Sequence, residues 1–445
     1  MAAIGIELVD TAVLAVRDGV RLAASPGVAL LEPGGLVVGE AAAAMARLKP
    51  VLATDRFWAD LAADVMAGPA EAPLSHAELA HAHLSSLWGA IAQPGDAAVF
   101  ALPGSMRLHQ AGLLLAIARR AGIPVAGAVD AAVAACAGFA ARATVLHLDV
   151  HLHQSVLTGL SGAPLLRRRR VDVAPRAGFK AMASAWAHLV AEAMVRRTRF
   201  DPLHQAAAEQ QLYERLPGWL ATLASADTVD AVIETAAGTF AATVRREQFT
   251  LAAEAWYAQL TEFVQAGHRA GEHATLALTT RAALLPALGE RLASLPGLEV
   301  VTLSETAAAA AAAARAGEIG PAEPPALAVA LPRARPVTGG PRLREGAVPP
   351  THVVQAGRAH EIGRQPLVVG AGGGRGCRLA LAAGAGISRE HCSLLRRGEE
   401  VVLRDHSRYG TWLNGERVDG EAVLGAGDRL RVGTPGVVLE LVAVG

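Results

Sequence analysis

The sequence predicts a multidomain protein in which a long α/β region precedes a small antiparallel β-sandwich. Before about residue 320, strand-like and helix-like hydrophobic patterns alternate, which is typical of an α/β core. After residue 350, short strands follow one another with Gly-rich turns between them and no helical pattern, which favours a β-sandwich. We therefore expect domains at residues 1–320 and 350–445, joined by a linker at 321–349.

The N-terminal region opens with an alternating pattern from Ile4 to Val16 that predicts a strand hairpin. Further on, a Pro-Gly pair precedes the helical pattern Arg107–Ala121, and Gly122 closes it. The remaining elements predicted here are a strand-to-helix segment at Leu36–Met45, strands at Ala98–Leu102 and Pro124–Ala128, a helix at Asp130–Ala140, a strand pair at Val145–Leu160, and helices at Ala181–Arg196 and Pro202–Ala224.

The linker at 321–349 is rich in Pro, Gly and Arg. Because proline fixes φ and removes a hydrogen-bond donor, the segment cannot sustain a regular helix or a central strand. Its middle, Leu327–Leu331, is the part that could still pack as a short strand. The strands predicted after it are His352–Ala356, Pro366–Val369, Cys392–Arg396, Glu400–Arg404, Thr411–Leu413, Arg429–Val432 and Val437–Val442.

Composition excludes several classes of protein. Of the 445 residues, 52% are hydrophobic and 18% are charged, which excludes a disordered chain. Lys+Arg and Asp+Glu are both 41, so no global charge points to nucleic acid or to a membrane surface. Three cysteines cannot form a disulfide framework. With no signal-peptide pattern and no uninterrupted apolar span, we expect a cytoplasmic protein, and the Arg-, Ala- and Gly-rich composition suggests a GC-rich bacterial genome.

Three motifs occur in order in the C-terminal region: GISREH at Gly386–His391, DHSRYGTWLNG at Asp405–Gly415, and LGAGDRLRVG at Leu424–Gly433. Together they resemble the forkhead-associated (FHA) domain over residues 350–445. The resemblance implies a phosphothreonine-binding module. Its site residues in this chain would be Ser388 and Arg389 at the phosphate, with Arg408, Tyr409, Thr411 and Asn414 in the second loop, and with His391 and Gly410 as structural residues.

The chemistry agrees with this role. A phosphate carries nearly two charges and three strong acceptor oxygens, and it needs charge-assisted hydrogen bonds from loops on a rigid scaffold. The hydroxyl of Ser388 and the guanidinium of Arg389 supply both kinds of donor. By resemblance, His391 ties one loop to the next and Asn414 holds the second loop.

Two departures from the family pattern affect the site. The family carries Gly-Arg at the end of its second strand, whereas this chain has Gly370 followed by Ala371. Arg375 or Arg378 in the next loop are the candidates to replace that charge. The family's Asn that bonds the peptide backbone is Tyr409 here. The alternative for the sandwich is a docking surface for an unphosphorylated partner.

The N-terminal region resembles the nucleotide-binding domain of DnaK-type heat-shock chaperones, within the actin-like ATPase superfamily. The stretches that carry this resemblance are AIGIELVDTAVLAV from Ala3, SPGVALLEPGGLVVGEAA from Ser25, AVFALPGSMRLHQ from Ala98, AGIPV from Ala121, DAAVAACAG from Asp130 and ETAAAAAAAAR from Glu305. The resemblance implies an α/β fold of the actin-like ATPase type with a nucleotide cleft. The chaperones' substrate-binding domain and lid do not follow, so peptide-release chaperoning is not implied.

The three glycine-rich elements that hold nucleotide in that superfamily have lost their glycines. Glycine is needed there because a Cβ would occupy the space of the phosphate oxygens. The first hairpin has Val9 in place of its Gly, the second has no Gly between Asp149 and Gln154, and the adenosine element has Thr280-Arg281. The positions of this vestigial nucleotide cleft are Glu7, Asp10, Thr11, Asp130, Asp149, His151 and His153.

This pattern favours a pseudo-ATPase scaffold with no cofactor and no catalytic residues. The alternative is a divergent ATPase that binds ATP and Mg²⁺ in an altered pose. His147, Asp149, His151 and His153 could share one strand face, but ligands about 6.6 Å apart along one strand make a tetrahedral zinc site awkward. We expect them to fill the vacated cleft.

Two further runs are interpreted as structural. The basic run at 167–170 is expected to be a solvated edge strand. The alanine run at Ala307–Ala314 is expected to be a closely packed helix.

The sequence therefore predicts a signalling adaptor whose partner is a phosphothreonine-containing protein, such as the substrate of a Ser/Thr kinase. No nucleic acid and no membrane insertion are expected, and the oligomeric state is left open. Two alternatives stay open: an ATPase regulated by the FHA-like domain, and a structural subunit that binds independently of phosphorylation.

Overall fold

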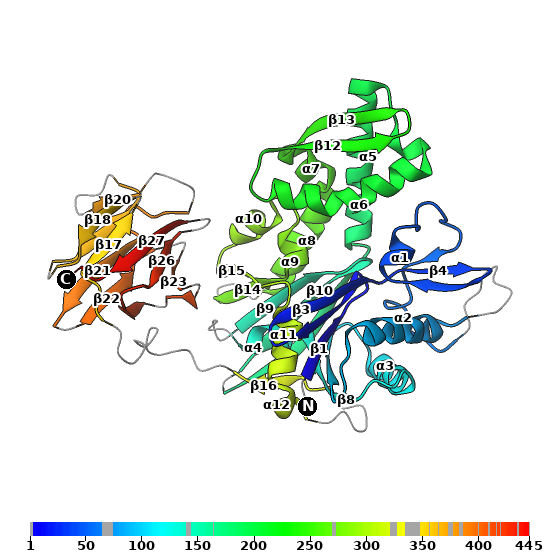
Figure 1. Cartoon of the computed structure of the whole chain (residues 1–445), viewed down its shortest axis with the longest axis horizontal. Helices are drawn as coiled ribbons and strands as arrows, with labels where there is room; N and C mark the ends of the chain where they lie inside the picture. The colour runs from blue at the N-terminus through cyan, green and yellow to red at the C-terminus, as the bar shows by residue number, and fades with distance from the viewer. Residues whose placement is uncertain are drawn as a thin grey trace. The chain divides into compact units, whose positions relative to one another are not determined.

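The chain divides into two compact units, Met1–Ala334 and Arg335–Gly445, which are described separately (Figure 1). The computed structural model describes residues 3–64, 74–138, 144–162, 164–268, 273–320, 327–333, 348–355, 357–363, 365–372, 377–381, 386–398, 400–407, 410–414, 416–418, 420–433 and 436–444.

The N-terminal unit contains two large sheets with the same connectivity. In each sheet, three consecutive antiparallel strands are followed by two strands that run parallel to the first. The first sheet is ordered β3-β2-β1-β7-β8, with β1 (Ala3–Leu8), β2 (Ala12–Arg17), β3 (Val20–Pro26), β7 (Ala97–Leu102) and β8 (Val125–Asp130). The second is ordered β15-β14-β9-β10-β11-β16, with β9 (Thr144–Val150), β10 (Gln154–Ser161), β11 (Leu165–Pro175), β14 (Ala274–Leu278), β15 (Leu298–Thr302) and β16 (Ala330–Pro332).

Alanine-rich helices lie between the two sheets. These are α4 (Ala131–Ala137) and α11 (Ala307–Ala314), and α12 (Ala316–Ile319) follows. The small side chains of α4 and α11 share one hydrophobic core with residues from both sheets. Helix α11 passes so close to β1 that a Cβ on Gly5 would lie 1.8 Å from the carbonyl oxygen of Ala309. The close packing expected for the alanine run is therefore confirmed.

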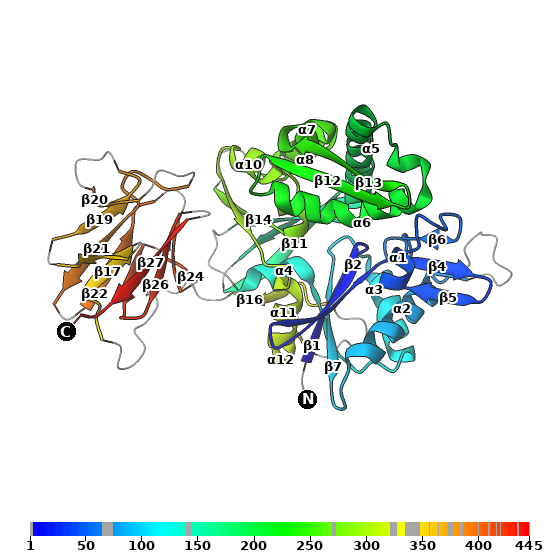
Figure 2. The same cartoon turned by 45° about the horizontal axis from the view of Figure 1, so that its top comes forward.

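Each large sheet with its helices forms one half of the N-terminal unit. In both halves, additional helices and strands follow the third strand of the sheet (Figure 2). In the first half they are β4 (Ala29–Glu32), β5 (Gly35–Val38), β6 (Ala53–Thr54), α1 (Glu40–Ala43) and α2 (His76–Ile91), while α3 (Leu108–Arg120) connects β7 to β8. In the second half they are α5 (Phe179–Thr198), η1 (Pro202–His204), α6 (Ala206–Leu223), β12 (Thr228–Thr235), β13 (Gly238–Arg245), α7 (Arg246–Ala252) and α8 (Glu254–Gly267), while α9 (Thr280–Ala283) and α10 (Leu288–Ala293) connect β14 to β15.

The C-terminal unit is a sandwich of two sheets around one hydrophobic core, as predicted. One sheet is ordered β18-β17-β27-β26-β23-β24, with β17 (His352–Gln355), β18 (Arg358–Glu361), β23 (Thr411–Leu413), β24 (Glu416–Arg417), β26 (Arg429–Val432) and β27 (Val437–Val442). The other is ordered β20-β19-β21-β22-β25, with β19 (Leu367–Gly370), β20 (Cys377–Ala380), β21 (Cys392–Arg397), β22 (Glu400–Asp405) and β25 (Glu421–Leu424). Pairing is antiparallel except between β19 and β20, which are parallel.

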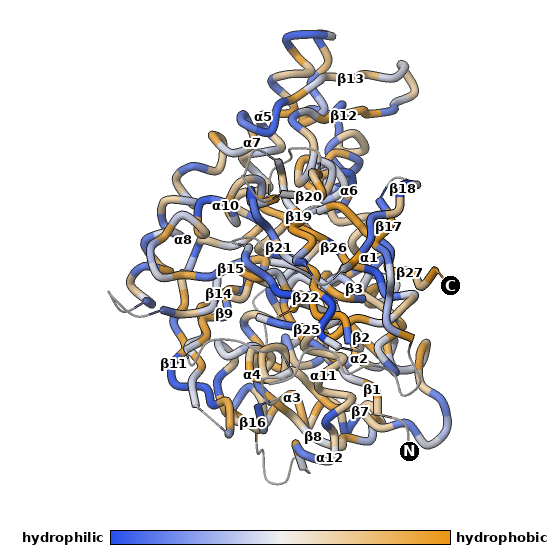
Figure 3. Tube along the Cα trace, turned by 90° about the vertical axis from the view of Figure 1, so that its left-hand side faces the viewer, coloured by the Kyte–Doolittle hydropathy of each residue, from blue (hydrophilic) through white to orange (hydrophobic). Residues whose placement is uncertain are grey.

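Two expectations about the N-terminal unit need correction: where the unit ends, and whether the basic run at 167–170 lies on an open edge. Residues 327–333 lie in the predicted linker. The short strand expected within Leu327–Leu331 is present as β16, and because it pairs with β11 and Leu331 is buried, this segment belongs to the N-terminal unit. For the same reason, the basic run at 167–170, blue in Figure 3, does not lie wholly on an open edge, because β16 covers its first residue. Within that run, Arg168 reaches inward to the buried Asp130 at 2.8 Å.

Candidate functional site

The loop that carries Ser388 and Arg389 crosses directly over the end of β19. A Cβ on Gly370 would lie 2.0 Å from the carbonyl oxygen of Arg389, so only glycine lets the loop approach this closely. The backbone N–H of Ala371 donates to the carbonyl of Ser388 at 3.0 Å, and the N–H of His391 donates to Val369 at 2.8 Å. The loop is thus pinned by backbone contacts on both sides of the two candidate donors.

His391 joins this loop to the next one. Its ring is fully buried, its Nδ1 accepts a hydrogen bond from the backbone N–H of Ser388 at 3.0 Å, and its Nε2 lies 2.8 Å from the carbonyl oxygen of Gly410. Because Nδ1 accepts and a carbonyl can only accept, the proton must sit on Nε2. One neutral imidazole therefore fixes the spacing of the two loops.

The second loop is built around Asp405. Its Oδ1 accepts from the backbone N–H of Ser407 at 3.0 Å and from the hydroxyl of Thr411 at 2.8 Å. The hydroxyl of Ser407 in turn accepts from the N–H of Gly410 at 2.7 Å. Thr411 is fully buried, so its hydroxyl shapes the loop from inside. Arg408 and Tyr409 lie outside the described residues.

A third loop closes the same end of the sandwich. The N–H of Gly433 donates to the carbonyl of Gly410 at 3.2 Å, and a Cβ on Gly433 would lie 2.4 Å from the carbonyl oxygen of Gly386. Three loops therefore meet around Ser388, which is half-buried, and Arg389, which is exposed. An exposed guanidinium beside a hydroxyl on a fixed backbone is suited to hold a phosphate dianion.

Asn414 does not belong to this cluster, which corrects its grouping with Ser388 and Arg389. Strand β23 separates it from Gly410. Its side chain donates to Asp428 at 2.8 Å and accepts from the N–H of Arg429 at 2.9 Å. It therefore secures the turn between β25 and β26. Of the candidates for the missing strand-end charge, Arg375 lies outside the described residues, as does the side chain of Arg378.

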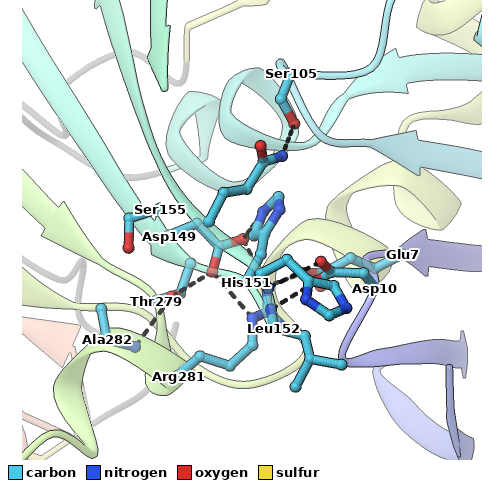
Figure 4. Close-up of polar contacts among 12 residues, drawn as sticks. Glu7, Asp10, Ser105, Asp149, His151, Leu152, Ser155, Thr279, Arg281 and Ala282 are labelled. Carbon is cyan, nitrogen blue, oxygen red and sulfur yellow. Dashed lines mark hydrogen bonds and ion pairs between the residues drawn. The ribbon is translucent and has the colours of Figure 1, made fainter. Parts of the chain in front are cut away.

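The N-terminal unit has a second polar cluster, between the first hairpins of its two sheets (Figure 4). Asp149, at the end of β9, is 5% exposed. Its carboxylate accepts from Arg281 Nε at 3.0 Å and Nη2 at 2.9 Å, and from the hydroxyl of Thr279 at 2.9 Å. His151 Nε2 lies 3.1 Å from the same carboxylate. Arg281 Nη2 also reaches Glu7 of β1, at 2.5 Å.

Charge in this cluster is balanced internally. Burial alone would raise the pKa of Asp149, but the charges of Arg281 and His151 outweigh it and hold that pKa well below its usual value. Burial lowers the pKa of a histidine, yet the neighbouring Asp149 raises that of His151 above its usual value. For His147, burial outweighs the charge of Asp149 and lowers the pKa to about 4.

Asp10 lies in the hairpin between β1 and β2, and its side chain accepts hydrogen bonds from the backbone of the hairpin between β9 and β10. Its two carboxylate oxygens accept from the N–H groups of Leu152 at 2.7 Å and His153 at 3.2 Å. These consecutive N–H groups belong to the turn between β9 and β10. Thr11 beside it has a buried hydroxyl with no hydrogen-bond partner among the described residues.

The remaining cleft candidates do not converge on one point. Asp130 is fully buried, accepts from the N–H of Val133 at 3.1 Å and pairs with Arg168. The ring of His153 turns away from Asp149 to Asp55, at 3.2 Å. His147, His151 and His153 therefore do not form one ligand set with Asp149.

Sequence reasoning missed Arg281 as a site residue, together with Asp55 and Lys180, which form an ion pair. The available signal for Arg281 was a charged residue at a position where a glycine was expected.

Comparison with known proteins identifies the C-terminal unit. Residues 360–433 match the family model of the FHA domain. No curated protein matches the chain. Among the described residues, no helix is both long and apolar enough to cross a membrane. The C-terminal unit therefore contains an FHA domain, a binding module that supports a role in protein interaction.

Proposed function

We propose that this protein is an adaptor that recognises phosphothreonine peptides through Ser388 and Arg389. The observation that carries the proposal is the position of these donors on a loop that Gly370, His391 and Gly433 hold against two others. A pre-positioned loop avoids the entropic cost of ordering donors when the ligand binds. The exposed Arg389 guanidinium then pairs with phosphate oxygens, while the backbone beneath it stays fixed.

The test is a titration of the full chain with a degenerate phosphothreonine peptide library and its unphosphorylated counterpart. A charge-assisted hydrogen bond contributes roughly 1.5–3 kcal/mol, so Arg389→Ala and Ser388→Ala should each weaken binding about ten- to a hundredfold. Arg358→Ala, an exposed arginine in β18 on the other sheet, is the matched control and should bind as the wild type does. If both libraries bind equally and Arg389→Ala does not change the affinity, the domain is a docking module that does not depend on phosphorylation.

We further propose that the N-terminal unit is an actin-like scaffold that does not hydrolyse ATP. The repeated strand order of its two sheets and the loss of glycine from all three nucleotide elements support this proposal. So does the size of the pocket beside the cleft, about 30 Å³, because pockets for small ligands measure about 300–1,000 Å³. This pocket is lined by Leu8, Val9, Asp10, Trp58, Ala59, Pro103, Ser105, Met106, Gln110, His151 and Gln154.

Calorimetry with ATP and Mg²⁺ tests the scaffold. We expect no heat of binding at millimolar nucleotide and no turnover. Micromolar affinity that is abolished by Asp149→Asn would instead support a divergent ATPase.

A further inference from the structure

The cleft of the N-terminal unit is not a set of vacated polar groups. Its backbone donors and its buried carboxylates already have partners, and two of these contacts, Asp10 with the second hairpin and Arg281 with Glu7, run from one half of the unit to the other. Asp10 lies in the hairpin between β1 and β2, and it accepts from two N–H groups in the hairpin between β9 and β10. Two adjacent N–H groups aimed at two oxygens of one anion form an anion site.

The carboxylates are matched in the same way. Glu7 and Asp149 are 4% and 5% exposed, and they belong to different sheets. Arg281 lies between them, with a forked contact to Asp149 and a single contact to Glu7. Two buried carboxylates so placed need a positive charge between them, since buried anions without a cation are strongly destabilising.

We propose that Asp10 and Arg281 are an intramolecular ligand of the cleft. Asp10 takes the place of a bound anion on the second hairpin, and Arg281 takes the place of a bound cation between Glu7 and Asp149. Together they fasten the two halves of the unit without any exchangeable ligand. This inference deepens the proposed scaffold role and rests on it.

A neighbouring contact works in the same direction. Asp55, in the segment after β6, pairs with His153 and Lys180 of the second half. Hydrogen bonds from these two residues outweigh burial and hold the pKa of Asp55 below its usual value. His153 therefore links to the first half twice, through its backbone to Asp10 and through its ring to Asp55.

The experiment is rescue by small ions, followed by thermal unfolding of the full chain. Arg281→Ala removes the guanidinium between Glu7 and Asp149, while His151 still contacts Asp149, and the loss of one member of a buried pair should lower the Tm of the N-terminal unit by roughly 5–10 °C. Carboxylates are ligands for hard divalent cations, so millimolar Ca²⁺ or Mg²⁺ should restore much of that loss. The same cations should leave the wild type unchanged.

Three further variants make the result specific. The double variant Glu7→Gln, Arg281→Ala removes one carboxylate and should show no response to cations. Arg281→Lys keeps the charge, should fold even if the alanine variant does not, and should also be insensitive to cations. Arg291→Ala removes an arginine that pairs with Glu254 at the surface, and it should change the Tm little.

Asp10→Ala tests the anion half of the proposal. It should lower the Tm, and millimolar inorganic phosphate should raise it again, whereas chloride at equal ionic strength should not. If Arg281→Ala and Asp10→Ala are as stable as the wild type, or if added ions shift the wild type and the variants equally, the inference is overturned. ATP binding by the wild type would instead overturn the scaffold role itself, and the two failures are therefore distinguishable.

Discussion

Replacing His391 by alanine should damage the C-terminal domain in a way that no other change at the phosphate site does. The ring is fully buried and bonds the N–H of Ser388 and the carbonyl of Gly410. Alanine removes the ring acceptor of the Ser388 N–H, leaves the Gly410 carbonyl with the N–H of Gly433, and opens a cavity, at about 1–3 kcal/mol for each buried partner that is lost. Because Ser388 is half-buried and can reach water, we expect a total loss of about 2–4 kcal/mol in the free energy of unfolding.

A loss of this size is measurable without abolishing the fold, because small domains are stable by about 5–15 kcal/mol. For a domain of this size it corresponds to a fall in Tm of roughly 10–20 °C in thermal unfolding of the full chain. Binding of a phosphothreonine peptide should weaken as well, because the two loops lose their common anchor. The matched control is His406→Ala, since His406 is exposed and its ring contacts the hydroxyl of Ser393, at 2.9 Å, at the surface.

The outcome that refutes this reasoning is specific. If His391→Ala unfolds at the wild-type temperature but no longer binds peptide, the imidazole contacts the ligand and does not act through the loops. If neither property changes, the two hydrogen bonds do not determine the spacing of the loops.

Three other predictions address charge, pH and modularity. Ala371→Arg restores an arginine at the end of β19, and peptide titration should show about tenfold tighter phosphopeptide binding, whereas unchanged affinity would mean that this position does not face the phosphate. Burial lowers the pKa of His83 and of His147 to about 4, so between pH 6.5 and 4 the unfolded chain binds more protons than the folded chain, and stability falls as the pH falls. The Tm of the N-terminal unit should therefore drop between pH 7 and 5, and it should drop less in His83→Gln. A flat profile of Tm against pH would contradict the burial argument. A fragment from about residue 345 to 445 should be soluble and unfold cooperatively by circular dichroism, since the two units have separate cores; an unfolded fragment would show that they share one.

Local signals in the sequence accounted for much of the fold. The hairpin from Ile4 to Val16 and the β-sandwich follow from alternation and from glycine-rich turns, which act over a few residues. The loop that carries Ser388 could be recognised because its motif is continuous. The segment Leu327–Leu331 was expected to be able to form a short strand inside a proline-rich linker, but its partner, the edge of β11, lies far away in the sequence and could not be predicted.

The parts that sequence could not predict depend on closure of the whole unit. Arg281 reaches Glu7 across 274 positions, and Asp10 reaches Leu152 across 142. No local pattern encodes such a contact, because neither a charged side chain nor the backbone N–H of Leu152 indicates its partner until the two sheets are brought together. Asn414 shows the converse problem: a motif places it beside Gly410, but the three residues of β23 carry it to the other end of the strand.

The shared strand order of the two large sheets has a consequence for the ancestry of the chain. Two halves with one connectivity are what the duplication and fusion of a single half-length unit would leave. In both halves the additional helices and strands follow the equivalent strand, β3 in one and β11 in the other. That connection is therefore where this architecture accepts inserted sequence. A foreign domain grafted there should disturb the paired strands less than one placed in the tight hairpins, which hold the halves together.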